Sequence, residues 1–122
     1  MILVDTSIWI DHLHKGDDVM DKLLSEDAVM MHPFVYGEIA MGSLKDRRVI
    51  LAELAKIPAA PVAKDAEVME FIETARLFGT GIGFIDAHLL ASAKLQADGL
   101  VWTRDRRLQV AAEELGIDAT TV

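Results

Sequence analysis

Short hydrophobic runs alternate along this chain with longer segments whose hydrophobic residues are spaced three and four positions apart. The short runs are ILV at residues 2–4, AVMM at 28–31 and LVWT at 100–103. Uninterrupted apolar runs of this length are typical of strands buried on both faces, whereas spacings of three and four predict helices. The alternation predicts an α/β protein with three α/β/α layers and a central, mainly parallel sheet of about four to five short strands.

Capping residues mark where several of the predicted helices begin. Thr6 or Ser7 can cap the first helix, Asp17 the second and Asp65 the fifth, because their side-chain oxygens can accept free backbone N–H groups. Pro33 suits the first position of the third helix. The predicted helices span, in order, residues 8–16, 18–24, 33–42, 45–57, 66–77, 84–94 and 107–115. A short extended piece is expected at 58–62 and a last strand at 119–122.

Length and composition limit the class of protein. The 122 residues fit one compact domain, 1–122, and a hydrophobic fraction of 52% excludes a disordered chain. No apolar run approaches the roughly 20 residues of a membrane span, and Asp5 interrupts the N-terminal run too early for a signal peptide. We therefore expect a cytoplasmic protein without membrane contact. Because the chain has no cysteine, disulfides, thiolate zinc sites and thiol redox chemistry are excluded.

The net charge of −8 argues against binding nucleic acid by bulk attraction. A nucleic-acid function must therefore use bound cations or a local basic patch. Arg104, Arg106 and Arg107 form the densest such patch, and we regard them as candidates for binding RNA phosphates. The same arginines could instead balance nearby acids or form the solvated start of a helix.

Two aspartates directly follow predicted strands. Asp5 comes after the run at 2–4, and Asp105 comes shortly after the run at 100–103. In open α/β sheets, functional groups gather outside the carboxyl ends of the strands. Both carboxylates are therefore candidates for one crevice, although an aspartate in such a place can also be a turn or helix cap.

Two further acids lie on the apolar stripes of predicted helices. By spacing, Glu38 shares a helix face with Phe34, Val35 and Met41, and Asp86 shares one with Leu89, Leu90 and Ala93. Both carboxylates are predicted to point inward. An ionised carboxylate facing the interior costs several kcal/mol unless it is paired or bound to a metal, although pairing with a basic side chain would also suffice.

Convergence of all four acids would require divalent cations. Hard oxygen ligands without cysteine favour Mg²⁺ or Mn²⁺ over zinc. Two such ions about 4 Å apart can activate water and neutralise a phosphate. The histidines lack the spacing of a metal pair and are predicted not to be ligands; they are His12, His14, His32 and His88. The glycine-rich run at 79–83 does not have the pattern of a phosphate-binding P-loop and predicts a turn between helices.

Four segments resemble, in order, those of PIN-domain toxins of the VapC type: VDTSIWI at 4–10, YGEIAMG at 36–42, DAHLLASA at 86–93 and LVWTRDRRL at 100–108. The resemblance implies a PIN-like fold and an endoribonuclease that depends on Mg²⁺ or Mn²⁺. By the same resemblance, Asp5 and Asp86 would be the main metal ligands, and Glu38 and Asp105 would complete the metal pocket. Thr103 would be a supporting hydroxyl.

The resemblance also implies a reaction and partners. A metal-activated water would hydrolyse an RNA phosphodiester and leave 5′-phosphate and 3′-hydroxyl ends. The protein would be the toxin of a type II toxin–antitoxin pair: a homodimer inhibited by a cognate antitoxin whose basic or apolar tail covers the groove.

Two other functions stay open on the sequence. A phosphotransferase of the haloacid-dehalogenase type could use Asp5 as a nucleophile, but its motif places a second aspartate where this chain has Ser7. A PIN-like scaffold could bind a partner without catalysing a reaction. Weak metal binding would favour the scaffold, and a phospho-enzyme trapped on Asp5 would favour the phosphotransferase.

Overall fold

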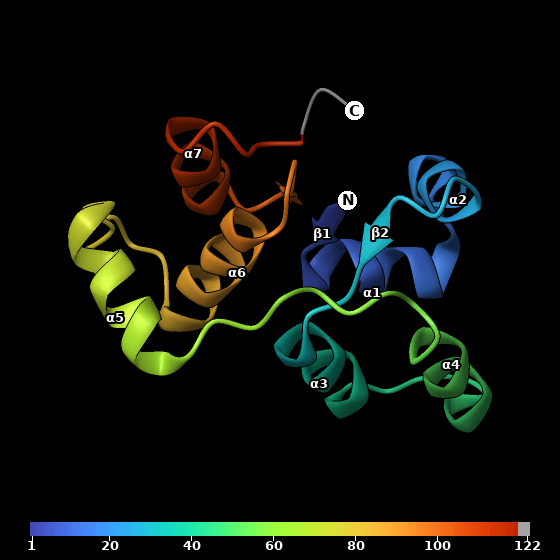
Figure 1. Cartoon of the computed structure of the whole chain (residues 1–122). Helices are drawn as coiled ribbons and strands as arrows, with labels where there is room; N and C mark the ends of the chain where they lie inside the picture. The colour runs from blue at the N-terminus through green and yellow to red at the C-terminus, as the bar shows by residue number, and fades with distance from the viewer. Residues whose placement is uncertain (120–122) are drawn as a thin grey trace.

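Three parallel strands form the centre of the fold in the computed structural model, which describes residues 1–119 (Figure 1). They are β1 (Ile2–Val4), β2 (Val29–Met30) and β3 (Leu100–Trp102), in the spatial order β2-β1-β3. The middle strand, β1, pairs with both neighbours. Because parallel strands need crossover connections, helices separate them along the chain. The predicted α/β class with a parallel sheet is confirmed.

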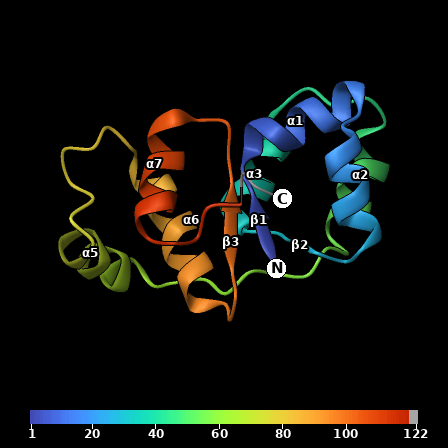
Figure 2. The ribbon, with the colours of Figure 1, turned by 90° about the horizontal axis from the view of Figure 1, so that it is seen from above.

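Seven helices of residues 1–119 surround this sheet. They are α1 (Thr6–Lys15), α2 (Asp18–Ser25), α3 (Pro33–Met41), α4 (Arg47–Leu54), α5 (Asp65–Thr74), α6 (Phe84–Leu95) and α7 (Arg106–Glu114). Figure 2 shows α5, α6 and α7 on the side of β3, and α1 to α4 on the side of β2. Among residues 1–119, no helix combines the length and apolar character needed to cross a membrane.

The sheet has fewer strands than the four to five predicted. The extended piece at 58–62 contributes a single parallel bridge, in which Ala59 pairs with Met31. Pro58 and Pro61 flank this bridge, and proline cannot donate a ladder hydrogen bond, so the pairing does not extend. On the other edge Asp118 forms one bridge with Val101. The predicted strand at 119–122 lies mostly outside the described residues.

One continuous hydrophobic core joins the sheet to its helices. Leu3 and Val4 of β1 are fully buried, as are Leu90 of α6 and Leu108 of α7. Trp9 of α1 is 1% exposed, which makes it a core residue. Burial of a large apolar side chain contributes about 1.5–3 kcal/mol, so this core holds the strand ends and the adjoining helix starts in fixed positions.

Several helix starts differ from the predicted caps. Asp17 caps α2 as predicted, since its Oδ1 accepts the Met20 N–H at 3.0 Å. However, α1 is capped by Asp5 rather than by Thr6 or Ser7, because the helix begins at Thr6, two residues before the predicted start at residue 8. In α5, Asp65 is the first helical residue instead of the cap.

Candidate functional site

Four acids, Asp5, Glu38, Asp86 and Asp105, form what we call the acid cluster. Asp5 follows β1, and Asp105 caps α7 just after β3; Glu38 lies on α3, and Asp86 lies in the first turn of α6. The cluster thus draws on the carboxyl ends of two neighbouring parallel strands and on two helices that are far apart in sequence.

The electrostatics of Asp86 show that these acids interact. Burial, and after it the carboxylates of Asp5, Asp105 and Glu38, raise the pKa of Asp86 to about 6, against a lowering hydrogen bond from the backbone of Gly83. Each neighbouring negative charge disfavours ionisation of Asp86. The structure therefore brings all four predicted acids into one electrostatic neighbourhood.

A network of hydroxyl groups orients the cluster. The buried Thr103 donates from Oγ1 to Asp5 Oδ2 at 2.7 Å and accepts the Asp105 backbone N–H at 3.0 Å. Thr103 thus ties the ends of β1 and β3 together. On the other side, Thr6 Oγ1 donates to Glu38 Oε1 at 3.3 Å. The sequence suggested only a capping role for Thr6, because its contact with Glu38 depends on how α1 and α3 lie against each other.

The Oδ1 atoms of Asp5 and Asp105 accept hydrogen bonds from backbone N–H groups. Asp5 Oδ1 accepts the Thr6 N–H at 2.8 Å, and Asp105 Oδ1 accepts the N–H groups of Arg107 and Leu108 at 3.0 and 3.1 Å. These bonds place carboxylates at the N-termini of α1 and α7, where the helix dipole favours negative charge. The capping and site positions therefore coincide in these two residues.

The prediction that Glu38 points inward is wrong, because its side chain is exposed. The buried side of α3 carries Val35 and Ile39, whereas Phe34 and Met41 are 37% and 88% exposed. The helix is apolar on several sides, so the pattern could not identify the buried side. By contrast, Asp86 is half-buried, and Leu90 on its stripe is fully buried, as predicted.

Arg104 is committed to other acids. Its Nη1 donates to Asp11 Oδ2 at 2.6 Å and its Nη2 donates to Asp17 Oδ2 at 2.9 Å. These bonds join the segment after β3 to α1 and to the start of α2. The guanidinium therefore balances acids outside the cluster, and the binding of RNA phosphates by Arg104 stays a prediction. Arg106 and Arg107 remain exposed.

His88 does not face the acid cluster. It is 1% exposed, its Nε2 lies 3.0 Å from Asp65 Oδ1, and its ring meets the edges of Phe34 and Phe84 with centroids 4.9 and 4.8 Å away. His32, also fully buried, lies 6.3 Å from His88 between ring centroids. These contacts are structural.

The spread of the acids bears on what they could bind. In the part of the chain that the structure describes, no three acidic or histidine side chains lie close enough together to enclose a metal ion. Mg²⁺, however, keeps several of its waters and is usually held by one or two carboxylates. The donor set consists of oxygens alone, which suits a hard divalent cation. The raised pKa of Asp86 shows that negative charge gathers there, and the spread of the acids fits an ion that keeps part of its water shell.

Fold and site together define an α/β protein with an acidic site at the carboxyl edge of a parallel sheet. The PIN domain family matches residues 2–114. The chain belongs to this family, as the order of its acidic segments implied.

The chain is also similar to individual proteins of known name. It is 44% identical over 117 residues to Ribonuclease VapC32 of Mycobacterium tuberculosis strain CDC 1551 / Oshkosh, a match that covers 96% of this chain and 94% of the relative. The values are the same for Ribonuclease VapC32 of strain ATCC 25618 / H37Rv. The resemblance to VapC-type members is thereby confirmed.

Two solved structures share the fold. FitAB bound to IR36 DNA fragment has a TM-score of 0.65 at 22% identity, covering 93% of this chain and 91% of the other. FitAcB from Neisseria gonorrhoeae has a TM-score of 0.64 at 24% identity, covering 93% and 94%. At this level of identity the likeness supports the architecture alone.

Proposed function

We propose that this protein is a metal-dependent endoribonuclease that acts as the toxin of a toxin–antitoxin pair. The observation that carries the proposal is the gathering of four acids around Asp86, whose pKa is raised to about 6 by burial and then by the charges of Asp5, Asp105 and Glu38. Folding does not normally gather four carboxylates without a compensating charge, and a divalent cation would supply it. The identity with Ribonuclease VapC32 supports RNA as the substrate class.

Asp5 and Asp86 would hold the ion. Asp5 is fixed by its hydrogen bonds to Thr6 and Thr103, and Asp86 by its position in the first turn of α6. A bound Mg²⁺ or Mn²⁺ would supply an activated water and neutralise the phosphate charge. Glu38 and Asp105 would complete the negative field that attracts the ion, and Thr103 would keep Asp5 oriented toward the cluster.

Hydrolysis would join the oxygen of a water to phosphorus and break the bond to the 3′ oxygen, which takes up a proton. The products would carry 5′-phosphate and 3′-hydroxyl ends. We include a cognate antitoxin and a second copy of this chain as partners, since the VapC-type resemblance implies both.

The proposal is tested by incubating total RNA with the purified, antitoxin-free protein. We expect discrete fragments with Mg²⁺ or Mn²⁺, none with a chelator, and a loss of roughly 100-fold or more in rate for Asp5→Asn. Asp18→Asn removes the same charge from exposed α2 and should cleave normally. RNA that stays intact in every metal condition would contradict the proposal.

A non-catalytic scaffold is the second candidate, because no three ligands are preassembled in residues 1–119. Calorimetric titration with Mg²⁺ and Mn²⁺ separates the two functions. Saturable binding that Asp5→Asn weakens favours the nuclease. A folded protein that neither binds these ions nor cleaves RNA would be a scaffold.

A further inference from the structure

A pocket next to the acid cluster is lined by three arginines. Arg76 follows α5, and Arg106 and Arg107 open α7; together with Thr80 and Glu114 they line a space of roughly 200 Å³, which we call the arginine pocket. A water occupies about 30 Å³ of liquid volume, so the space can take a phosphate group with its waters. Such a concentration of positive charge is unusual in a chain with only 12 basic residues against 20 acidic ones.

The three guanidiniums are not neutralised by the protein. All three side chains are exposed. In residues 1–119 no carboxylate oxygen lies within 4.0 Å of a nitrogen of these guanidiniums, although Glu114 lines the same pocket. Arg104, in contrast, is held by two aspartates. The arginine pocket therefore keeps charge available for an external anion.

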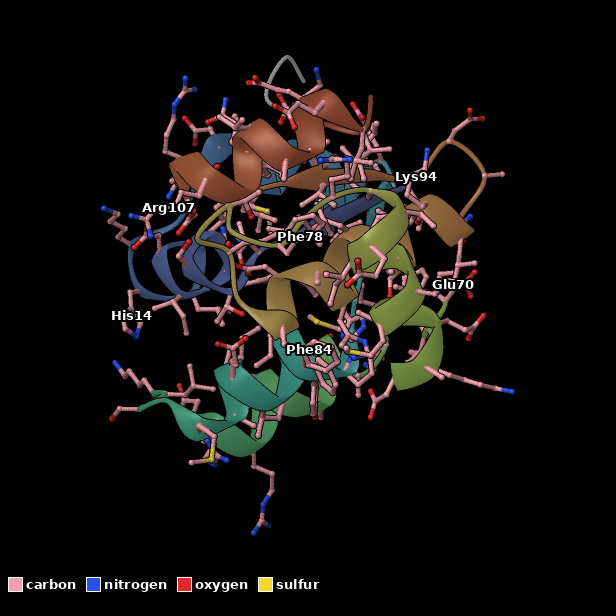
Figure 3. The ribbon with its side chains drawn as sticks, turned by 90° about the vertical axis from the view of Figure 1, so that its left-hand side faces the viewer. His14, Glu70, Phe78, Phe84, Lys94 and Arg107 are labelled. Atoms are coloured by element: carbon pink, nitrogen blue, oxygen red, sulfur yellow. The ribbon has the colours of Figure 1, made fainter. Side chains whose placement is uncertain are left out.

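The backbone of the loop at 79–83 lies close to the Arg107 side chain. Gly81 has φ +91°, and a Cβ added there would lie 2.8 Å from Arg107 Cδ and 3.0 Å from its Nε. Glycine thus allows the loop at 79–83 to approach the guanidinium stem closely. Figure 3 shows Arg107 at the beginning of α7 and Phe78 in the neighbouring loop; the Arg76 guanidinium lies 5.9 Å from the Phe78 ring centroid.

The arginine pocket and the acid cluster share two structural elements. Arg106 and Arg107 directly follow Asp105, which caps α7. The loop that touches Arg107 leads to Gly83, whose backbone hydrogen bond lowers the pKa of Asp86. A ligand that bridges the two sites would thus place one anionic group among arginines and another beside carboxylates.

We infer that the arginine pocket binds a backbone phosphate of the RNA strand next to the phosphate that is cleaved. This inference rests on the proposed ribonuclease function. Guanidinium groups bind phosphate through paired, charge-assisted hydrogen bonds. The pocket also explains how an acidic protein attracts a polyanion: the favourable contact is local and begins at the two residues that follow Asp105.

The test measures binding separately from cleavage. A fluorescein-labelled single-stranded oligoribonucleotide is titrated with the Asp5→Asn protein, alone and combined with Arg76→Gln or Arg106→Gln, by fluorescence anisotropy at several salt concentrations. Each arginine variant should weaken binding roughly tenfold, and the log–log salt slope should fall by about 0.7 per lost phosphate contact. Arg48→Gln, on α4 at the other side of the molecule (Figure 1), is the matched charge control and should bind normally.

Several outcomes would overturn the inference. Arginine variants that bind the oligonucleotide like the control would exclude the pocket from RNA binding, even if the wild-type protein cleaves RNA. Arginine-dependent binding of inorganic phosphate without an effect on RNA would make it a small-anion site, and loss of antitoxin binding alone would make it a protein interface. Conversely, arginine-dependent RNA binding in a protein that never cleaves RNA would support the pocket and refute the nuclease.

Discussion

The acid cluster and a neighbouring histidine cluster use the same two helices in opposite ways. We define the histidine cluster as His32 and His88 with the rings of Phe34 and Phe84, which meet edge to face. His32 and Phe34 open α3, which also carries Glu38, and Phe84 and His88 lie on α6 with Asp86. Figure 3 shows Phe84 at the start of α6, close to α3.

Helix geometry separates the two clusters. Asp86 and His88 are two residues apart, which places them on different sides of α6. Asp86 turns to the edge of the sheet and meets other carboxylates, whereas His88 turns into aromatic rings and is 1% exposed. In one cluster burial raises the pKa of a carboxyl group, and in the other it lowers the pKa of His32 to about 4. Both shifts disfavour the charged form of the group.

Removing Asp86 should give the largest change. We expect Asp86→Asn to lower RNA cleavage roughly 100-fold or more, because a proposed metal ligand is lost. The metal-free variant should also melt at a higher temperature than wild type at pH 7. Since the folded pKa of about 6 exceeds the ordinary 3.8, the carboxylate destabilises the fold above pH 6 and not below about pH 4.

Cleavage assays and thermal melts in chelator, at pH 7 and pH 4, check both parts of this prediction. Asp18→Asn serves again as the charge control. An Asp86→Asn protein that cleaves RNA at the wild-type rate would remove this residue from the site. A variant without any gain in melting temperature would show that burial of the Asp86 charge and repulsion from its neighbours destabilise the fold little.

The histidine cluster should determine how stability falls in mild acid. Burial, and secondly the charge of His88, lower the pKa of His32 from 6.5 to about 4. The unfolded chain takes up this proton below pH 6.5 and the folded protein does not, so stability is lost as the pH falls from 6.5 toward 4. The loss attributable to His32 is about 2 kcal/mol at pH 5 relative to pH 7.

His32→Asn isolates this effect, because asparagine can still accept the Phe34 N–H that His32 Nδ1 accepts at 3.0 Å. Denaturant unfolding at pH 7 and pH 5 should show a smaller loss for the variant than for wild type. Between pH 7 and pH 5, protonation of Asp86 raises the stability of the folded protein. Because Asp86 is present in both proteins, this gain cancels when their stability losses are subtracted. Equal losses would assign the acid sensitivity to other groups.

The smallest effect is expected from Thr103, which positions acids without being one. Thr103→Val keeps the shape but removes the donor to Asp5 and the acceptor of the Asp105 N–H, and should reduce cleavage roughly tenfold. Thr103→Ser keeps the hydroxyl and should retain most activity. Calorimetric Mg²⁺ titration of both variants tests whether the loss acts through Asp5. Equal metal affinity and activity in both would show that the hydroxyl is dispensable.

Much of the fold followed from local patterns. The runs that became β1 and β3, the proline at the start of α3 and the cap at Asp17 were predicted because each depends on neighbouring residues alone. Local patterns could not show that the segments around Ala59 and Asp118 form single bridges instead of full strands. Pairing of Ala59 or Asp118 with the sheet depends on how far each segment runs beside a strand that is distant in sequence.

The site was predictable in its members and less so in its contacts. Asp5 and Asp86 lie near the positions that their patterns suggested. Glu38 is exposed, since the apolar pattern of α3 does not distinguish its buried side. Arg104 pairs with Asp11 and Asp17, which are 93 and 87 residues away in the sequence, so no local spacing could indicate these contacts.

The sequence by itself determined the chemistry: four acids, no cysteine, strands followed by aspartates, and few basic residues. Only the tertiary structure decided which charges meet. It brought Glu38 and Asp86 to the ends of β1 and β3, and it left the arginine pocket open beside them. The reason is physical, because hydrophobic periodicity is encoded within a few turns of chain, whereas the distance between two charges depends on how helices pack across the whole core.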